Sequence, residues 1–146
     1  MTRIDFYLDA ADRLQVACRV AAKAIAQNHK VVIYAPDGDT ARALDRMMWI
    51  APAIGFVPHV MAEHKLAAET PVVIARDAVT TLHDDVLVNL HHDHPASFAR
   101  FQRLIEIVGQ DEAGKQVARE RYRFYRDRGY EIHTHRLGAQ PAGDDG

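Results

Sequence analysis

Apolar residues follow two patterns that alternate along the chain. Short runs of strand type, rich in Val, Ile, Leu and aromatic residues, predict six strands, at 3–8, 30–35, 71–75, 86–90, 104–108 and 130–135. Apolar positions at helical spacing predict long helices at 10–27, 40–49 and 115–128, and a short helix at 98–102. Asp9 is expected to cap the first helix and Asn28 to end it.

This alternation favours an α/β fold, a three-layer α/β/α sandwich around a mostly parallel, Rossmann-like sheet. The pattern runs through residues 1–136 with no repeat and no linker long enough to divide it, so a single domain is expected. A chain of 146 residues can bury a core of its own. Residues 137–146 are rich in Gly, Pro and Asp and are expected to form a disordered tail.

Cysteine usage and the N-terminal sequence indicate the cellular setting. The single cysteine, Cys18, excludes an internal disulfide and a multi-cysteine zinc module, and such usage suits a reducing cytoplasm. The first ten residues lead into a strand-like run that contains acids, unlike a signal peptide. No apolar stretch approaches the length of a membrane span. We therefore expect a cytoplasmic protein without a membrane partner.

The sequence offers only weak candidates for a nucleotide, metal or catalytic site. A dinucleotide site needs glycines where the first strand meets the first helix, but the turn here is "LDAADR", with two acids and no glycine. The histidines of "HHDH" at 91–94 are adjacent and precede a proline, which favours a solvated loop over a metal site. No catalytic residue, cofactor or metal ligand is expected, and a nucleotide-binding α/β enzyme is the less favoured alternative.

The segment 115–128 concentrates positive charge. It contains six Lys or Arg and two acidic residues, in a chain whose formal net charge is −2. A helical projection places five residues, called here the basic stripe, on one side: Lys115, Arg119, Tyr122, Arg123 and Arg126. The opposite side carries Val117, Phe124 and Tyr125, through which this helix is expected to pack against the core.

The basic stripe predicts an anionic partner. Like charges four residues apart repel one another, so a stripe of nearly one sign costs stability unless a ligand compensates, which favours a partner over a merely solvated helix face. Arginine can hold a carboxylate in bidentate fashion, and Tyr122 adds an amphipathic ring. An acidic peptide with an apolar last residue and a free carboxylate would suit such a surface. A phosphate backbone would also fit, so a direct nucleic-acid-binding protein stays as the alternative.

Large apolar residues also gather around a proline-containing loop, at Trp49, Phe56, Val57 and Pro58. These residues either close the edge of the core or form an exposed patch for docking another protein. Exposed apolar clusters usually mark interfaces, so the docking interpretation predicts a second partner.

Two motifs carry a resemblance to a known family. The segments "LDRMMWIAPAIGFVPH" (44–59) and "KQVARERYRFYRDRGYEI" (115–132), with "IDFYL" at the start and "LIEIV" at 104–108 in consistent places, resemble the chi subunit of the bacterial DNA polymerase III holoenzyme. The resemblance covers the chain to about residue 135. It implies a non-catalytic accessory protein of the clamp-loader assembly that meets DNA only indirectly.

The resemblance also implies two binding surfaces. In that family a basic pocket holds the acidic C-terminal tail of single-stranded DNA-binding protein, whose last residue is phenylalanine. The matching positions are Lys115, Arg119, Tyr122 and Arg123, with Arg126 on the same stripe and Val108 as a pocket wall. The other surface binds the psi subunit and matches Trp49, Phe56, Val57 and Pro58. A helicase or another loader subunit stays open as an equivalent second partner.

Overall fold

The computed structural model describes residues 1–50, 57–76, 83–93 and 98–137. Within these ranges one seven-stranded sheet has the order β3-β4-β2-β5-β6-β1-β7, and each neighbouring pair of strands is parallel. The strands are β1 (Arg3–Ala10), β2 (Val31–Tyr34), β3 (His59–Met61), β4 (Val72–Ala75), β5 (Val86–Asn89), β6 (Arg103–Gly109) and β7 (Glu131–Arg136). The expected single-domain α/β fold with a mostly parallel sheet is confirmed.

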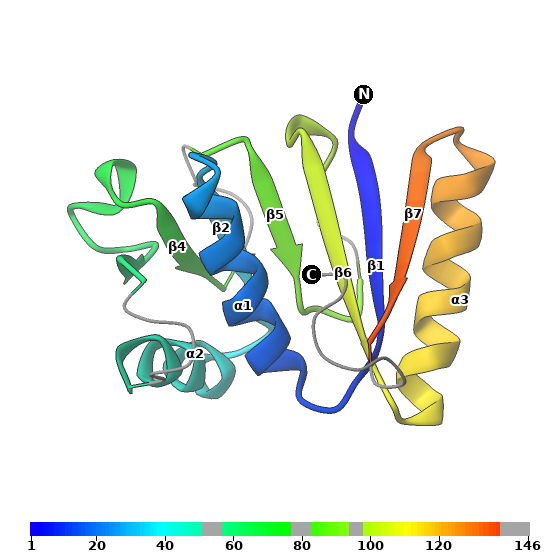
Figure 1. Ribbon diagram of the computed structural model, residues 1–146, viewed down its shortest axis with the longest axis horizontal. Coiled ribbons are helices and arrows are strands. Elements are labelled where there is room, and N and C mark those ends of the chain that lie inside the picture. The colour runs from blue at the N-terminus through cyan, green and yellow to red at the C-terminus, as the bar shows by residue number, and fades with distance from the viewer. Residues whose placement is uncertain (51–56, 77–82, 94–97, 138–146) are drawn as a thin grey trace.

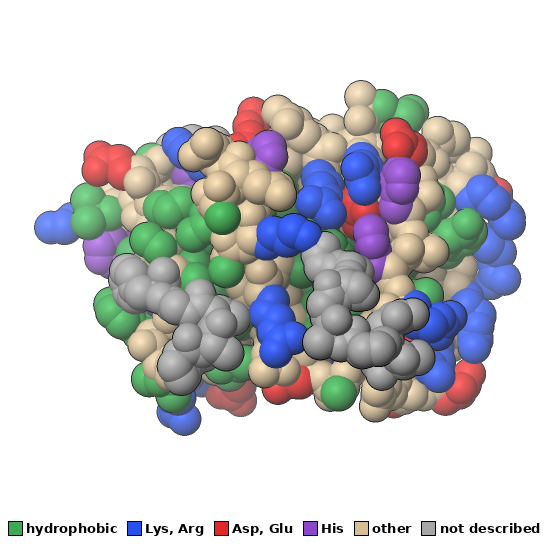
Figure 2. Space-filling view, viewed as in Figure 1, with side chains coloured by type: hydrophobic (Ala, Val, Ile, Leu, Met, Phe, Trp, Pro, Cys, Tyr) green, Lys and Arg blue, Asp and Glu red, His purple; other side chains and the backbone are tan. Residues whose placement is uncertain are grey.

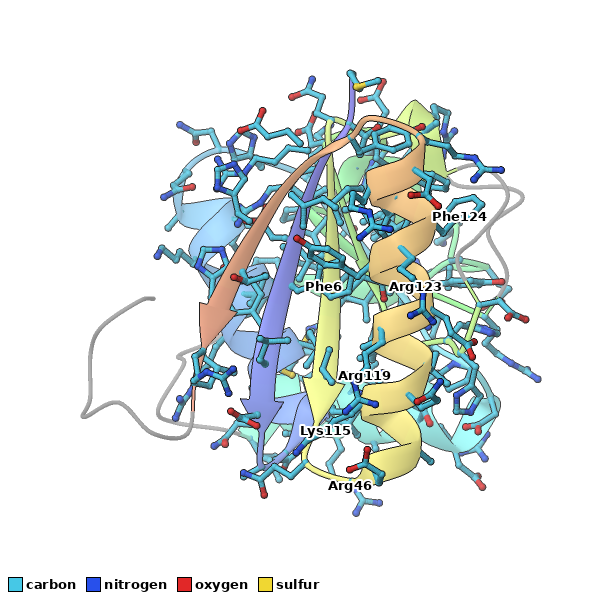
Figure 3. All side chains as sticks on the ribbon, turned by 90° about the vertical axis from the view of Figure 1, so that its right-hand side faces the viewer. Phe6, Arg46, Lys115, Arg119, Arg123 and Phe124 are labelled. Atoms are coloured by element: carbon cyan, nitrogen blue, oxygen red, sulfur yellow. The ribbon has the colours of Figure 1, made fainter. Side chains whose placement is uncertain are left out.

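Helices cover both faces of this sheet. Helices α1 (Arg13–Ala26) and α2 (Gly38–Ile50) lie on one face, and α3 (Glu112–Asp127) lies on the other, beside β7 (Figures 1 and 3). Two short 3₁₀ segments complete the described elements, η2 (Ala67–Glu69) and η3 (Phe98–Arg100). The expected short helix at 98–102 is therefore the 3₁₀ segment η3.

The alternation of side chains along β1 and β6 divides the core into two layers. Tyr7, Ile105 and Ile107 face α1 and α2, whereas Phe6 and Leu104 face α3. Successive side chains of a strand point to opposite faces, and both faces of this sheet are covered, so the central strands are apolar in both directions. The continuous β-branched runs of the sequence have this origin.

The first helix starts later than its sequence suggests. Its N-cap is Asp12, whose carboxylate accepts from the N–H groups of Leu14 and Gln15, and not Asp9 as expected. Asp9 still belongs to β1, which continues to Ala10. The expected end at Asn28 is correct, since this residue adopts a φ of 68° and its N–H donates to the Ile25 carbonyl at 2.9 Å.

One strand was missed from the sequence. β3 is three residues long and pairs only with β4, at one edge of the sheet. A run of three residues beginning with His59 is too short to show the period of a strand, so only its pairing with β4 defines it.

Candidate functional site

Helix α3 has a defined signal at each end. The Asp111 carboxylate accepts from the Gly114 N–H at 2.9 Å and caps the N-terminus. At the C-terminus Gly129 takes a φ of 81°, and its N–H donates to the Arg126 carbonyl at 3.0 Å. The Tyr130 N–H then donates to the Tyr125 carbonyl at 3.2 Å, which completes a Schellman motif. The sequence between these caps therefore forms a helix of definite length.

The inner side of α3 is held to the sheet by a buried polar network. Arg121 is only 8% exposed and donates to the Glu106 carboxylate at 3.3 Å. The same guanidinium donates to the carbonyls of His91 and His92, on the loop after β5. Glu106 also accepts from the Tyr125 hydroxyl at 2.6 Å. The network therefore joins α3 to β6 and to the loop after β5.

Burial sets the ionisation of this network. It raises the pKa of the Glu106 carboxyl above its usual range, and the Arg121 charge and the Tyr125 hydroxyl oppose that rise. Burial and the adjacent Glu106 carboxylate also raise the pKa of Tyr125, which keeps its hydroxyl as a donor. Arg121 is thus a structural cation, although the sequence suggests an exposed one among its basic neighbours.

The helical projection identified the packing side of α3 correctly but left out Arg121. Tyr125 is fully buried, and Phe124 and Val117 are partly buried, as expected. Arg121 falls between Val117 and Tyr125 in the same projection, so its position on the packing side was a signal of its burial. The acid in "LIEIV", Glu106, was the second signal, because a carboxylate in a core strand needs a cationic or hydrogen-bonding partner.

The outer side of α3 and the adjacent strands enclose a groove of about 530 Å³. All six residues predicted for the peptide pocket line it: Lys115, Arg119, Tyr122, Arg123, Arg126 and Val108. Figure 3 looks onto this side of the molecule, with Lys115, Arg119 and Arg123 along α3 and Phe6 on β1.

The sheet supplies the rest of the groove, which the sequence did not reveal. Its lining includes Phe6 and Leu8 from β1, Gly109 from β6, and Thr134 from β7. Phe6 is 2% exposed, and its ring lies 5.7 Å from that of Tyr122, which is 38% exposed. Apolar carbon thus forms the floor and the middle of the groove.

Positive charge dominates the groove. Arg136 of β7 adds a fifth cation to the four on α3, and Asp9 is the one carboxylate among the described lining residues. Figure 2 shows Lys and Arg side chains gathered at the edge that α3 forms. Arg119 contacts Glu112 at 3.3 Å, an ion pair that is largely exposed on both sides. Solvent weakens such a pair, so it leaves the guanidinium available to a ligand.

Two groove cations have no acidic partner within the described chain. No ion pair of Lys115 or Arg123 occurs there, whereas Arg126 meets Asp127 at 3.2 Å, again at the surface. The stripe therefore keeps most of its positive charge, as the like-sign pattern predicts.

The apolar patch expected around Trp49 is only partly exposed. Trp49 is 60% exposed and the adjacent Ile50 is 67% exposed, at the C-terminal end of α2. Val57 is 1% exposed and packs in the core, so the expectation of an exposed Val57 is wrong. Pro58 is partly buried, and Phe56 lies outside the described residues. Ile50 was missed in the sequence because it ends the helix next to the more conspicuous Trp49.

His59 supports Trp49 from the adjoining strand. The two rings meet edge to face with centroids 5.3 Å apart, and His59 Nε2 lies 3.0 Å from an Asp45 carboxylate oxygen. The histidine that closes the "FVPH" motif thus positions the exposed tryptophan.

Metal-ligating side chains do not cluster in the described part of the chain. No group of three His, Cys, Asp or Glu side chains there is placed to hold a metal ion. His91 stacks on Tyr34 with ring centroids 3.9 Å apart, and His94 lies outside the described residues. None of the described helices is both long and apolar enough to cross a membrane.

Comparison with known proteins identifies the family. Residues 1–133 match the family model described as DNA polymerase III chi subunit, HolC. The chain is 39% identical over 141 residues to the DNA polymerase III subunit chi of Pseudomonas aeruginosa, which covers 94% of this chain and 98% of the relative. It is 31% identical over 121 residues to the subunit chi of Escherichia coli, covering 82% of each chain. The subunit chi of Haemophilus influenzae is 30% identical over 125 residues, covering 85% of this chain and 87% of the relative. The resemblance inferred from the two motifs is confirmed, and the chain belongs to the DNA polymerase III chi subunit family, a family of replication accessory subunits rather than catalytic ones.

Proposed function

We propose that this chain is an adaptor. It binds the acidic C-terminal tail of single-stranded DNA-binding protein in the groove beside α3, and it connects that protein to the clamp loader through the apolar surface at Trp49. One observation carries the first half of this proposal: the basic stripe of α3, Val108 of β6 and residues of β1 and β7 line a single groove with cationic walls and an apolar floor.

The chemistry of the groove fits both parts of such a tail, its carboxylates and its terminal aromatic ring. The side-chain carboxylates and the terminal carboxylate would meet Lys115, Arg119 and Arg123, and the two guanidinium groups can each donate a bidentate pair of hydrogen bonds to a carboxylate. The ring of a terminal phenylalanine would pack on the exposed ring of Tyr122, which the buried Phe6 ring supports from beneath. The positive groove would also accelerate the encounter with an acidic peptide in a chain of net negative charge.

Calorimetric titration with an acidic peptide ending in phenylalanine tests this half of the proposal. We expect a Kd of about 1 μM, equivalent to roughly −8 kcal/mol, that rises with added salt because exposed charges are screened. Binding should be lost when the terminal phenylalanine is removed and when Arg119 is replaced by Ala. Arg19→Ala is the matched control, since Arg19 is an exposed arginine of α1 on the other face of the sheet.

A direct nucleic-acid-binding role makes the opposite prediction. Single-stranded oligonucleotides would then bind the groove and compete with the peptide, and loss of the terminal phenylalanine would change nothing. Absence of peptide binding together with oligonucleotide binding that Arg119→Ala removes would replace the adaptor proposal with this alternative.

The second half of the proposal concerns the exposed end of α2. Trp49 and Ile50 provide an apolar surface for a psi subunit or an equivalent replisome partner, such as a helicase or another loader subunit. Co-purification of this chain with a candidate psi subunit tests it. Trp49→Ala should abolish the association, and Leu66→Ala, a change at an exposed apolar residue elsewhere, should not. Equal loss in both variants would contradict the assignment.

A further inference from the structure

The groove contains one carboxylate where an acidic ligand is expected. Asp9 forms an ion pair with Arg136, the last residue of β7, and both side chains line the groove. The Arg136 side chain is 60% exposed and that of Asp9 is 25% exposed. The pair lies on the sheet side of the groove, opposite α3. Among the described lining residues, Arg136 is the one cation that comes from the sheet.

The backbone at the end of β1 is what turns Asp9 into the groove. In a regular strand Leu8 and Asp9 would point to opposite faces, but both line the groove. The pairing of β1 with β6 shifts register between Tyr7 and Ala10, and Asp9 adopts a φ of 64°. This left-handed conformation is uncommon for a residue other than glycine, and irregularities of this kind re-aim a side chain.

The Asp9 main chain is also held in place. Its carbonyl accepts from the Gln110 side-chain amide at 3.3 Å, and Leu137, the residue after β7, donates its N–H to the Leu8 carbonyl at 2.9 Å. The carboxylate is therefore presented to Arg136 by a fixed backbone and not by a freely moving loop tip.

We propose that Asp9 is an internal competitor for the acidic ligand. In the free protein its carboxylate occupies Arg136 and holds that guanidinium on the sheet side of the groove. A carboxylate of the ligand must displace Asp9 from Arg136 on binding, and the loss of the Asp9–Arg136 ion pair lowers the affinity, which favours ligands with several carboxylates over simple anions. This inference rests on the proposed function of the groove, because it assumes an anionic ligand there.

The competitor role predicts a gain of binding from a single substitution. Asp9→Asn is nearly isosteric and tolerates a positive φ, so it removes the charge without disturbing the turn. Its Kd for the phenylalanine-ended acidic peptide should be about three-fold lower than that of the unaltered chain, in the range that exposed charge pairs contribute. Asp9→Gly, which also accepts this backbone, should show the same gain.

Two controls separate this effect from a change in net charge. Glu63→Gln removes one exposed carboxylate beyond β3, at the far edge of the sheet, and should leave the Kd unchanged. In an Arg136→Ala background Asp9→Asn should add little, because two residues that act through one ion pair are not additive.

The outcomes distinguish the two proposals. If the unaltered chain does not bind the peptide, the proposed function fails and this inference with it. If it binds but Asp9→Asn and Asp9→Gly leave the Kd unchanged or raise it, the competitor role is overturned while the function stands. An equal gain with or without Arg136 would also overturn it, because the effect would then be general electrostatics.

Discussion

The groove beside α3 and the surface at Trp49 are built in opposite ways. In the groove, charged side chains stand over an apolar floor, and the helix that carries them is tied to the sheet by the buried pair of Arg121 and Glu106. At the end of α2, Trp49 and Ile50 are exposed apolar side chains, and the His59 ring contacts Trp49 from one side. Ionic hydrogen bonds depend on direction and distance, whereas apolar contact depends mainly on area, so only the groove needs a helix fixed from beneath.

The two surfaces also lie far apart in the fold. Helix α2 packs near β3 and β4 on one face of the sheet, and α3 packs near β6 and β7 on the other (Figure 1). An adaptor needs such separation, because each ligand then leaves the other surface open.

The largest expected effect concerns the support of α3. Arg121→Ala leaves Glu106 buried without its cation and two carbonyls without a donor, so unfolding free energy should fall by about 3 kcal/mol. Arg119→Ala, at an exposed position of the same helix, should change it by less than about 0.5 kcal/mol. Urea unfolding of both variants measures the difference, and equal stability would show that the buried pair does not anchor the helix.

The next effect distinguishes core from surface within the apolar motif. Val57→Ala creates a cavity in the core and should cost about 2 kcal/mol of unfolding free energy. Trp49→Ala removes a mostly exposed ring and should cost far less, despite its larger volume. Thermal or urea unfolding of the two variants measures the difference in unfolding free energy. A larger loss for Trp49→Ala would mean that the tryptophan closes the core edge.

Acid should weaken the edge of the sheet that bears the groove. Burial would raise the pKa of Asp5, but hydrogen bonds from His135 and Arg103 outweigh it and lower the pKa below 3.8. A carboxyl with a lowered pKa in the folded state stabilises the fold above its unfolded pKa, and this contribution is lost as pH falls through the folded value. Unfolding free energy should therefore decline below about pH 4, and Asp5→Asn should flatten that decline. An unchanged pH profile in Asp5→Asn would exclude Asp5 as the cause.

The smallest effect is the expected absence of coupling between the two surfaces. The Kd for the acidic peptide should be the same with and without a saturating psi-type partner, because no helix or strand of the described residues lies at both surfaces. Titration of the peptide into the preformed complex measures this. A several-fold change in either direction would show that the surfaces communicate or overlap.

Much of the fold could be predicted from the sequence. The six strands other than β3, the three long helices and the basic stripe all follow from local sequence patterns that extend over enough residues to be recognised. The strand β3 could not be predicted, because three residues are too few to show a period. The cap of α1 was placed at Asp9 and not at Asp12, because β1 continues past Asp9 through an irregular end.

Only the α3 side of the groove, together with Val108, could be predicted from the sequence. The stripe and Val108 are visible in the sequence, but the burial of Arg121 and of Val57 depends on what packs against them. A charged residue among charged neighbours looks exposed until its partner, Glu106, is placed beside it.

The sequence by itself thus determined most helices and strands of this protein, its family and the cationic wall of the groove, because each of these depends on residues close together in the chain. Only the tertiary structure decided what faces that wall. Pairing of β1 with both β6 and β7 brings Asp9 to Arg136 across 127 positions of sequence and lays Phe6 beside Tyr122. Contacts between such distant residues arise from strand order in the parallel sheet, which no local pattern encodes.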